Sequence, residues 1–217
     1  MLAVTEPDFL RDTRVSYNAM AASYTEHFKS GIDDMPIDRA VLAVFAELVR
    51  RTGNVDAVDV GSGPGHVTEY LKSLGLNIFG IDLSSEMVAL ARGMRPGVRF
   101  EEGSMTALEL PEGSLGGVCA WYSTIHIPDA ELPGVLSGFR RVLEPGGWLV
   151  LAFQSGDHVQ HYDEGFGHAL SLDFYRREAA HVAELLGAAG FEVYTRTERG
   201  PNPDEKTSQA YLTARAV

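Results

Sequence analysis

Apolar residues occur along the chain in two alternating patterns. Short segments rich in apolar residues, each typical of a strand, appear between residues 55 and 154 as VDAVDVG, LNIFGID, GVRFEEG, GGVCAWY and WLVLAFQ. Stretches with apolar residues at helical spacing lie between most of these runs, and a later one reads RREAAHVAELLGAAG. Strands that alternate with helices predict a doubly wound α/β fold, in which helices cover both faces of a parallel sheet.

The chain ends in two further strand-like segments, FEVYTRT and SQAYLTARAV. The linker between them, ERGPNPDEK, is too short for a helical crossover, so we expect the two strands to pair antiparallel. The sequence therefore predicts a seven-stranded sheet that is mostly parallel and has an antiparallel last strand. A parallel sheet that finishes in a hairpin is not the usual dinucleotide-binding plan.

A chain of 217 residues fits one domain with a full hydrophobic core. Residues 36–51 begin with proline and end with arginines, as a helix does. Its expected buried face consists of Ile37, Ala40, Val41, Val44 and Leu48. We divide the single domain 1–217 into an N-terminal helical cover at 1–54, a ligand-binding core at 55–154, a polar lid insertion at 155–175, and a closing helix and hairpin at 176–217.

The formal net charge of -12 at pH 7 narrows the choice of partners. A field of that sign repels phosphate backbones, which argues against nucleic acid as the main partner. The single cysteine, Cys119, rules out an internal disulfide and a multi-cysteine zinc site, and its apolar neighbours predict burial. The first twenty residues show no secretory signal, and no apolar stretch approaches the length of a membrane span. We therefore expect a cytoplasmic protein that does not bind membranes.

Three glycines follow the first strand in VDVGSGPGHVT, where a helix is expected to begin. Gly61, Gly63 and Gly65 leave the backbone bare, so a ligand can approach it closely, and the helix N-terminus offers free N–H groups. A dinucleotide fingerprint requires glycine at the sixth position, which is His66 here. Asp82 closes the second strand, where a carboxylate can accept both hydroxyls of a ribose. The loop and the acid predict a ligand that contains a nucleoside.

Together these segments resemble the class I S-adenosylmethionine (SAM)-dependent methyltransferases. VDVGSGPGHVT is similar to their first motif, and GIDLS to the acid at the end of their second strand. EGSMTALELPEGSLGGVCAWYSTIHI resembles the segment with the adenine contact and the fourth strand, and VLEPGGWLVLAF resembles their third motif. YNAMAASYTEHF resembles the opening helix of the small-molecule branch. The resemblance covers residues 17–217 and implies a Rossmann-like fold with S-adenosyl-L-methionine as cofactor and S-adenosyl-L-homocysteine (SAH) as product.

The resemblance also implies where the cofactor binds. Asp59 would reach the ammonium group, Asp82 the ribose hydroxyls, and Leu83 the adenine ring. Relatives often carry aspartate where this chain has Ser104, so a hydroxyl would serve the adenine amino group here. The other implied cofactor-binding residues are Tyr17, Gly61, Ser62, Gly63, Gly65, Met87, Met105, Trp121 and Tyr122.

Several of these residues have a structural alternative to a cofactor contact. The alternative for Asp59 is a hydrogen bond to neighbouring backbone. For Asp82 it is the N-cap of the following helix, although Ser84 is better placed for that role. Met105 could equally fill the core. The alternatives stay open at the level of the sequence.

His126 is the candidate catalytic residue. It follows the fourth strand in YSTIHIPD, at the edge where the sulfonium methyl should point, and a neutral imidazole there can accept a proton from a hydroxyl or amine. The alternative is that His126 braces its loop. Tyr17 and Tyr24 lie seven residues apart and share a helix face, and Arg14 is a candidate partner for a carboxylate.

Residues 155–170 form the least helical passage of the chain and contain His158, His161 and His168 beside three acids. A lid over the acceptor is the favoured interpretation, and an ordinary loop is the main alternative. The irregular spacing, without an H-E-x-x-H helix, argues against a metal site. We predict no metal.

The preferred interpretation is a SAM-dependent methyltransferase that transfers a methyl group to an O, N or activated C atom of a small-molecule metabolite. The reaction is a direct in-line displacement, in which positioning supplies much of the acceleration. One alternative is a non-catalytic SAM-binding regulatory protein. The other is an NAD(P)-dependent oxidoreductase, against which His66 and the closing hairpin argue. The sequence specifies neither the acceptor nor the oligomeric state.

Overall fold

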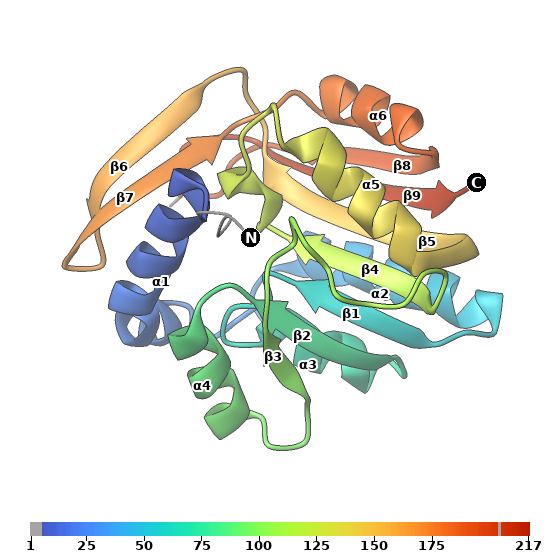
Figure 1. Cartoon of the computed structure of the whole chain (residues 1–217), viewed down its shortest axis with the longest axis horizontal. Coiled ribbons are helices and arrows are strands. Elements are labelled where there is room, and N and C mark those ends of the chain that lie inside the picture. Colours follow the sequence, from blue (N-terminus) through green and yellow to red (C-terminus); the bar gives the residue numbers. More distant parts are fainter. Residues whose placement is uncertain (1–5, 204) are drawn as a thin grey trace, which may run out of the picture.

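The computed structural model describes residues 6–203 and 205–217. Seven strands of the described residues form one sheet in the order β3-β2-β1-β4-β5-β9-β8 (Figure 1). These strands are β1 (Asp56–Val60), β2 (Asn77–Asp82), β3 (Phe100–Glu102), β4 (Leu115–Trp121), β5 (Leu143–Gln154), β8 (Phe191–Arg199) and β9 (Gln209–Ala216). β1 to β5 pair in parallel, whereas β9 pairs antiparallel with both β5 and β8. The predicted sheet is therefore confirmed.

The strand order reverses between β1 and β4, which creates the place where such sheets bind ligands. β2 and β3 follow on one side of β1, while β4 and β5 lie on the other, so the connections after β1 and β4 lead away from each other. In the register of the sheet, Asp59 aligns with Gly80 on β2 and with Cys119 on β4. The residues that directly follow β1, β2 and β4 therefore lie at one edge of the sheet.

Helices cover both faces of the sheet, as predicted. α2 and α3 pack on the face that carries Cys119 and Tyr211, and α5 and α6 pack on the face that carries Val118 and Leu149. No helix in the described part of the chain is long and apolar enough to cross a membrane. The helices are α1 (Asp8–His27), α2 (Pro36–Thr52), α3 (His66–Ser73), α4 (Ser85–Met94), the short 3₁₀ helix η1 (Thr124–His126), α5 (Leu132–Val142) and α6 (Ala179–Ala188).

The predicted buried face of α2 is correct only in part. Val41 and Leu48 of that face pack against the core, whereas Ile37 and Val44 are 44% and 47% exposed. The helix is turned by about one residue relative to the prediction, since its buried side chains are those of Asp38, Leu42, Phe45, Ala46 and Val49. The predicted and the observed buried faces of α2 both have apolar residues at helical spacing. Asp38, a charged residue in the first turn, made the observed face look interrupted in the sequence.

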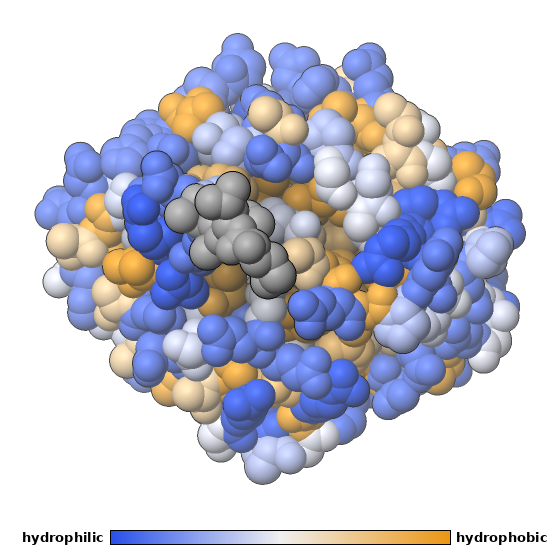
Figure 2. Space-filling model, in the orientation of Figure 1, coloured by the Kyte–Doolittle hydropathy of each residue, from blue (hydrophilic) through white to orange (hydrophobic). Residues whose placement is uncertain are grey.

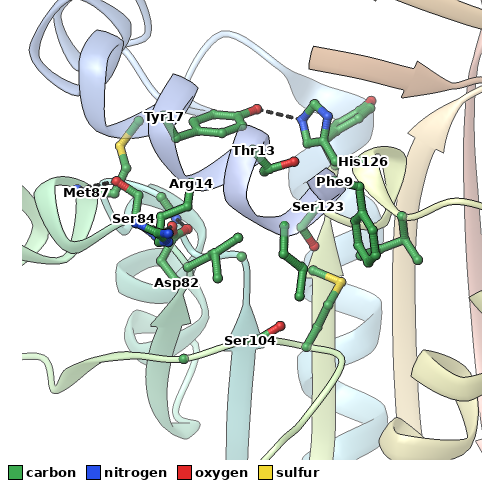
Figure 3. A pocket seen from close by; sticks show the side chains of 18 of the residues that line it. Phe9, Thr13, Arg14, Tyr17, Asp82, Ser84, Met87, Ser104, Ser123 and His126 are labelled. Carbon is green, nitrogen blue, oxygen red and sulfur yellow. Dashed lines mark hydrogen bonds between the residues drawn. The ribbon is translucent and has the colours of Figure 1, made fainter. Parts of the chain in front are cut away.

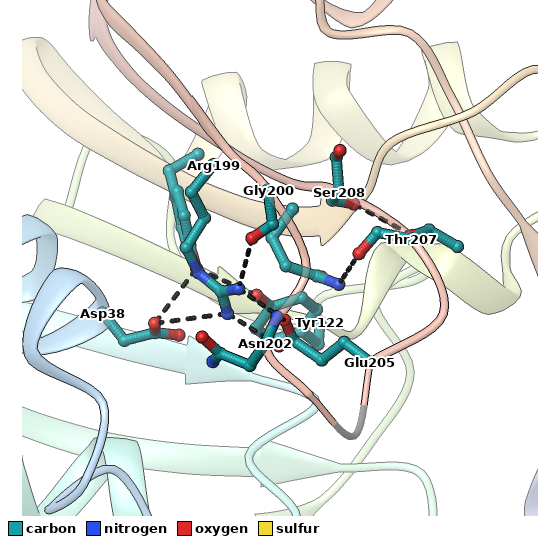
Figure 4. Close-up of polar contacts among 10 residues, drawn as sticks. Asp38, Tyr122, Arg199, Gly200, Asn202, Glu205, Thr207 and Ser208 are labelled. Carbon is teal, nitrogen blue, oxygen red and sulfur yellow. Dashed lines mark hydrogen bonds and ion pairs between the residues drawn. The ribbon is translucent and has the colours of Figure 1, made fainter.

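Asp38 can be buried because it belongs to a polar network between α2 and the β8–β9 hairpin (Figure 4). Its Oδ2 accepts a hydrogen bond from the Tyr211 hydroxyl at 3.0 Å and lies 3.8 Å from the Arg199 guanidinium. Arg199 also donates to the Tyr211 oxygen and to both carboxylate oxygens of Glu205. Tyr122 donates to the same Tyr211 oxygen at 3.2 Å. The network thus joins α2 to the residue that follows β4.

Residues 159–175 form a two-stranded hairpin that is separate from the main sheet, consisting of β6 (Val159–Gly165) and β7 (His168–Tyr175). β7 packs along α1 (Figure 1). The Ser16 hydroxyl of α1 donates to the Ser171 carbonyl at 3.4 Å and accepts from the Ser171 N–H at 3.0 Å. Phe166, at the hairpin turn, packs against the ring of Tyr24. The sequence indicated a segment without a helix here, but not the hairpin or its attachment to α1.

Candidate active site

The glycine loop after β1 has two different sides. Gly61 and Gly63 both have positive φ, 75° and 51°, which disfavours any residue with a side chain. A Cβ on Gly61 would lie 2.2 Å from the Cβ of Ser123, so this glycine lets the loop pack against the segment after β4. A Cβ on Gly63 would meet nothing within 4 Å, and Gly63 lines a pocket. The bare backbone at Gly63 is therefore free for a ligand.

Asp82, at the end of β2, faces this loop. Its carboxylate accepts a hydrogen bond from the Gly63 N–H at 2.7 Å and another from the Ser84 N–H at 2.9 Å. Burial raises the pKa of Asp82, and the two backbone hydrogen bonds oppose that rise. Ser84, not Asp82, caps α4, because the Ser84 hydroxyl accepts from the Met87 N–H at 3.1 Å. The carboxylate of Asp82 is thus held at the pocket wall.

The pocket lies over the carboxyl edge of β1, β2 and β4, and α1 closes it from the other side (Figure 3). Most of the residues that the sequence predicted for the site line it. They are Tyr17, Gly61, Gly63, Asp82, Leu83, Met87, Ser104, Met105, Trp121, Tyr122 and His126. Segments distant in the sequence therefore meet here as the motifs indicated.

Asp59, Ser62 and Gly65 are not among the residues that line the pocket. The Asp59 carboxylate is buried beneath the loop, where the Thr68 hydroxyl donates to it at 2.7 Å and the Cys119 thiol donates as well. Burial raises the pKa of Asp59 to about 6. An ammonium contact for Asp59 stays a prediction, in which a water or the loop backbone would have to mediate.

His126 forms a hydrogen-bonded pair with Tyr17 of α1. Its Nδ1 lies 2.9 Å from the carbonyl oxygen of Asp173, which can only accept, so Nδ1 carries the proton. In a neutral ring Nε2 is then an acceptor, and the Tyr17 hydroxyl donates to it at 2.8 Å (Figure 3). Burial lowers the pKa of His126 to about 4, so the ring is neutral at pH 7. Burial raises the pKa of Tyr17 well above its ordinary value, which keeps the phenol protonated.

Several elements fix the position of the His126 ring. The ring belongs to η1, and the Phe174 ring of β7 packs against its face edge-on, with centroids 4.6 Å apart. The buried guanidinium of Arg177 donates to the carbonyls of Thr124 and Ile127, on either side of His126. Arg177 is itself paired with Asp129 at 2.8 Å. The imidazole is thus oriented by β7 and by the residues that hold η1.

No sequence motif indicated that the first turns of α1 contribute to the pocket. Phe9, Leu10 and Thr13 line it, as do Ser84, Gly103, Ser123 and Ile127. Phe9, Thr13 and Tyr17 follow one another at intervals of four residues, so helical spacing from Tyr17 would have pointed to them. Arg14 also lines the pocket, where it donates to both carboxylate oxygens of Glu6 at 3.2 and 2.6 Å.

Two of the three histidines of the hairpin segment, His161 and His168, have separate surroundings. His161 lies between Asp173 at 2.7 Å and Asp163 at 3.1 Å, and these carboxylates raise its pKa. His168 lies 3.2 Å from the Ser23 hydroxyl of α1. The structure has no group of three or more His, Cys, Asp or Glu side chains arranged to hold a metal within residues 6–203 and 205–217.

Comparisons with known proteins agree with this geometry. Residues 57–147 match the family model described as "Methyltransferase domain". The chain is 33% identical over 120 residues to a malonyl-[acyl-carrier protein] O-methyltransferase of Pectobacterium atrosepticum. That alignment covers 50% of this chain and 46% of that protein. It is 28% identical over 176 residues to the sterol 24-C-methyltransferase ERG6B of Gibberella zeae, which covers 72% of this chain and 45% of that protein. The chain thus spans about half the length of these curated relatives.

Solved structures show the same fold over nearly the whole chain. The magnesium protoporphyrin IX methyltransferase ChlM of Synechocystis PCC 6803 aligns with a TM-score of 0.73 at 16% identity, over 98% of this chain and 99% of that one. The structure described as a DhpI-SAH complex aligns with a TM-score of 0.73 at 22% identity, over 98% of each chain. This likeness shows that the chain has the fold of these solved structures, and residues 57–147 match a methyltransferase domain within it.

Proposed function

We propose that the protein is a SAM-dependent methyltransferase that acts on a small-molecule metabolite by direct in-line displacement. The observation that carries the proposal is the pocket at the strand-order reversal, where the open side of Gly63 and the carboxylate of Asp82 face the same space. A ligand with a ribose and a positively charged tail suits that combination. SAM supplies an already activated methyl group there, so the protein has mainly to orient the acceptor.

The residues present fit the cofactor. Asp82 keeps free lone pairs after its two backbone hydrogen bonds and would accept the ribose hydroxyls. Leu83 and Met105 would flank the adenine ring, and Ser104, at the same end of the pocket, would bond to its amino group. The bare loop at Gly61 and Gly63 would run beneath the methionyl part, with Trp121 and Tyr122 along its other side. Tyr17 and Met87 complete the predicted cofactor contacts.

A small acceptor fits better than a macromolecule. α1 closes one side of the pocket, and the net charge of -12 repels phosphates. Polar residues cover most of the face seen in Figure 2. Relatives described as malonyl-[acyl-carrier protein] and ubiquinone O-methyltransferases support O-methylation. With its single buried cysteine, the protein suits the cytoplasm.

Ligand binding separates this proposal from a nicotinamide enzyme. SAH at a hundred times its Kd should raise the melting temperature by about 5–10 °C, because such occupancy stabilises by about 2.7 kcal/mol. NADH at the same concentration should leave it unchanged. A rise with NADH and none with SAH would overturn the proposal.

Turnover separates the proposal from a non-catalytic SAM-binding protein. Methyl-labelled SAM is incubated with the protein and a pool of small metabolites, and labelled products are separated from SAM. Label should pass to a metabolite fraction with wild-type protein and not with Asp82→Ala. SAH binding without any transfer would favour the regulatory alternative.

A further inference from the structure

The end of the pocket near His126 carries no free charge. Phe9 and Tyr17 lie beside His126 in the lining (Figure 3), and Ile127, Trp121 and Tyr122 also line the pocket. Of the charged side chains that line the described pocket, Asp82 lies at the end of β2 and is bonded to the glycine loop. Arg14 is neutralised by its two hydrogen bonds to Glu6. An acceptor group at this end would therefore meet aromatic faces and one polar pair, Tyr17 and His126.

The direction of the hydrogen bonds in this pair is fixed. The Asp173 carbonyl holds the proton of His126 on Nδ1, and Nε2 accepts the proton of the Tyr17 hydroxyl. The Tyr17 oxygen therefore keeps free lone pairs, while its own proton already points toward a base. A hydroxyl in the pocket can donate to that oxygen. The pair is thus arranged to pass one proton from the pocket to His126.

We propose, on the basis of the proposed function, that the methyl acceptor is a phenol-type hydroxyl and that Tyr17 is a catalytic residue which relays the acceptor's proton to His126. This role for Tyr17 replaces direct proton transfer to His126, because the Tyr17 hydroxyl occupies Nε2.

The step balances in atoms and charge. The acceptor oxygen forms a bond to the methyl carbon, and the bonding pair of the breaking carbon–sulfur bond stays on sulfur. The acceptor's O–H bond breaks, its proton binds the Tyr17 oxygen, and the former Tyr17 proton binds Nε2 of His126. The positive charge on sulfur disappears as one appears on the imidazole. The net charge inside the buried pocket is unchanged, so the transfer avoids a large desolvation cost. After the products leave, the proton returns from His126 through the Tyr17 hydroxyl to water that enters the pocket.

The chemistry of the walls favours a phenol over other acceptors. A carboxylate or phosphonate is already ionised and would need a cation, and the described lining offers only Arg14, which Glu6 occupies. A protonated amine would need a carboxylate, and Asp82, the carboxylate of the described lining, is already hydrogen-bonded to the glycine loop. A phenol has a pKa of about 10, as tyrosine does, and its O–H becomes far more acidic as the oxygen binds the methyl group. The imidazole, whose pKa is about 4, can therefore take the proton in the transition state. Its ring also packs well against aromatic walls.

The test uses the full chain, labelled SAM and probe acceptors that differ in the reacting group. The probes are phenol, 2-naphthol, benzoate, phenylphosphonate and benzylamine. We expect methylation of the two hydroxyl compounds, at least a hundredfold faster than of the others. Faster methylation of benzoate, phenylphosphonate or benzylamine would overturn the acceptor assignment. SAH binding without methylation of either hydroxyl compound would overturn it too and leave the proposed function standing, whereas failure to bind SAH would overturn both.

A second comparison tests the relay. Tyr17→Phe keeps the ring that packs against Tyr24 and His126 and removes only the hydroxyl. With 2-naphthol, kcat should fall by about a hundredfold, while the Kd of SAH stays close to wild type. With 4-nitrophenol at a pH where it is ionised, the variant should come within threefold of wild type, because no proton remains to be moved. Equal losses on both substrates would make Tyr17 a mere support for the ring and overturn the relay.

Tyr194→Phe is the matched control. Tyr194 is 63% exposed on β8 and lies outside the pocket, so the loss of its hydroxyl should change neither substrate's rate.

Discussion

The carboxylate of Asp82 lies 2.7 Å from the backbone nitrogen of Gly63, so the end of β2 holds the glycine loop of β1 in place. One side chain therefore has two tasks, because it shapes the loop and offers its remaining lone pairs to the pocket. Asp82→Ala removes both contributions. The Kd of SAH should rise at least tenfold, since an unmade hydrogen bond at a buried site costs about 1–3 kcal/mol.

Isothermal titration calorimetry with SAH measures this loss. Glu112→Ala is the control, because Glu112 is an exposed acid remote from the pocket. An Asp82→Ala protein that binds SAH as wild type does would contradict the ribose assignment.

His126 should make the fold sensitive to acid. Its pKa is about 4 in the folded protein against an ordinary value of 6.5, so between these values the unfolded state binds more protons. The free energy of unfolding therefore falls as the pH drops from 6.5 toward 4. For this residue the loss from pH 7 to pH 5 is about 2 kcal/mol. Urea unfolding of wild type and His126→Gln at both values should show a smaller drop in the variant, and equal drops would refute the shift.

The Asp59 carboxylate changes the free energy of unfolding with pH in the opposite direction. Its pKa is about 6 in the folded protein against 3.8, so the folded state binds the extra proton and stability falls as the pH rises through 6. Asp59→Asn removes the buried charge and should stabilise the protein at pH 8 by about 1–3 kcal/mol in urea unfolding. If Asp59 serves the cofactor's ammonium group, the same variant should bind SAH about tenfold more weakly. Unchanged SAH affinity would mean that the Asp59 carboxylate serves only its hydrogen bonds with Thr68 and Cys119.

Arg199 should be important for stability, although it does not line the pocket. Arg199→Gln leaves Asp38 buried without its cation and should cost about 3 kcal/mol in thermal or urea unfolding. Arg196→Gln on the same strand is the control, because its 4.0 Å pair with Glu198 is half exposed and should matter by less than about 0.5 kcal/mol. Adding Asp38→Asn to Arg199→Gln should recover part of the loss, and strictly additive effects would contradict the coupling.

The features of this structure that could be predicted are those determined by residues close together in the sequence. The central strands of the sheet were short segments rich in apolar residues, and Gly61 and Gly63 marked the loop because their positive φ disfavours other residues. The antiparallel pairing of β9 followed from the short linker that precedes it. Local patterns also placed Asp82 at the pocket, since a strand end fixes where its last side chain lies.

Contacts between distant segments were beyond such patterns. The buried side of α2 was misjudged because Asp38 is neutralised by Arg199 and Tyr211, more than 160 residues away in the sequence. Tyr17 and His126 were each singled out, but their hydrogen bond joins positions 109 residues apart. In the β6–β7 hairpin, exposed residues alternate with residues most of which are only partly buried. The two strands therefore lack a run of apolar residues, and little in the sequence indicated that they are strands.

The double hydrogen bond between Ser16 and Ser171 has a consequence for engineering. A helix side chain here takes the place of a neighbouring strand and satisfies both backbone groups of one hairpin residue. A graft that exchanged only the hairpin with that of a relative would lose this match and leave two polar groups without partners. Chimeras intended to change which compound is methylated should therefore transplant α1 and the β6–β7 hairpin as one cassette.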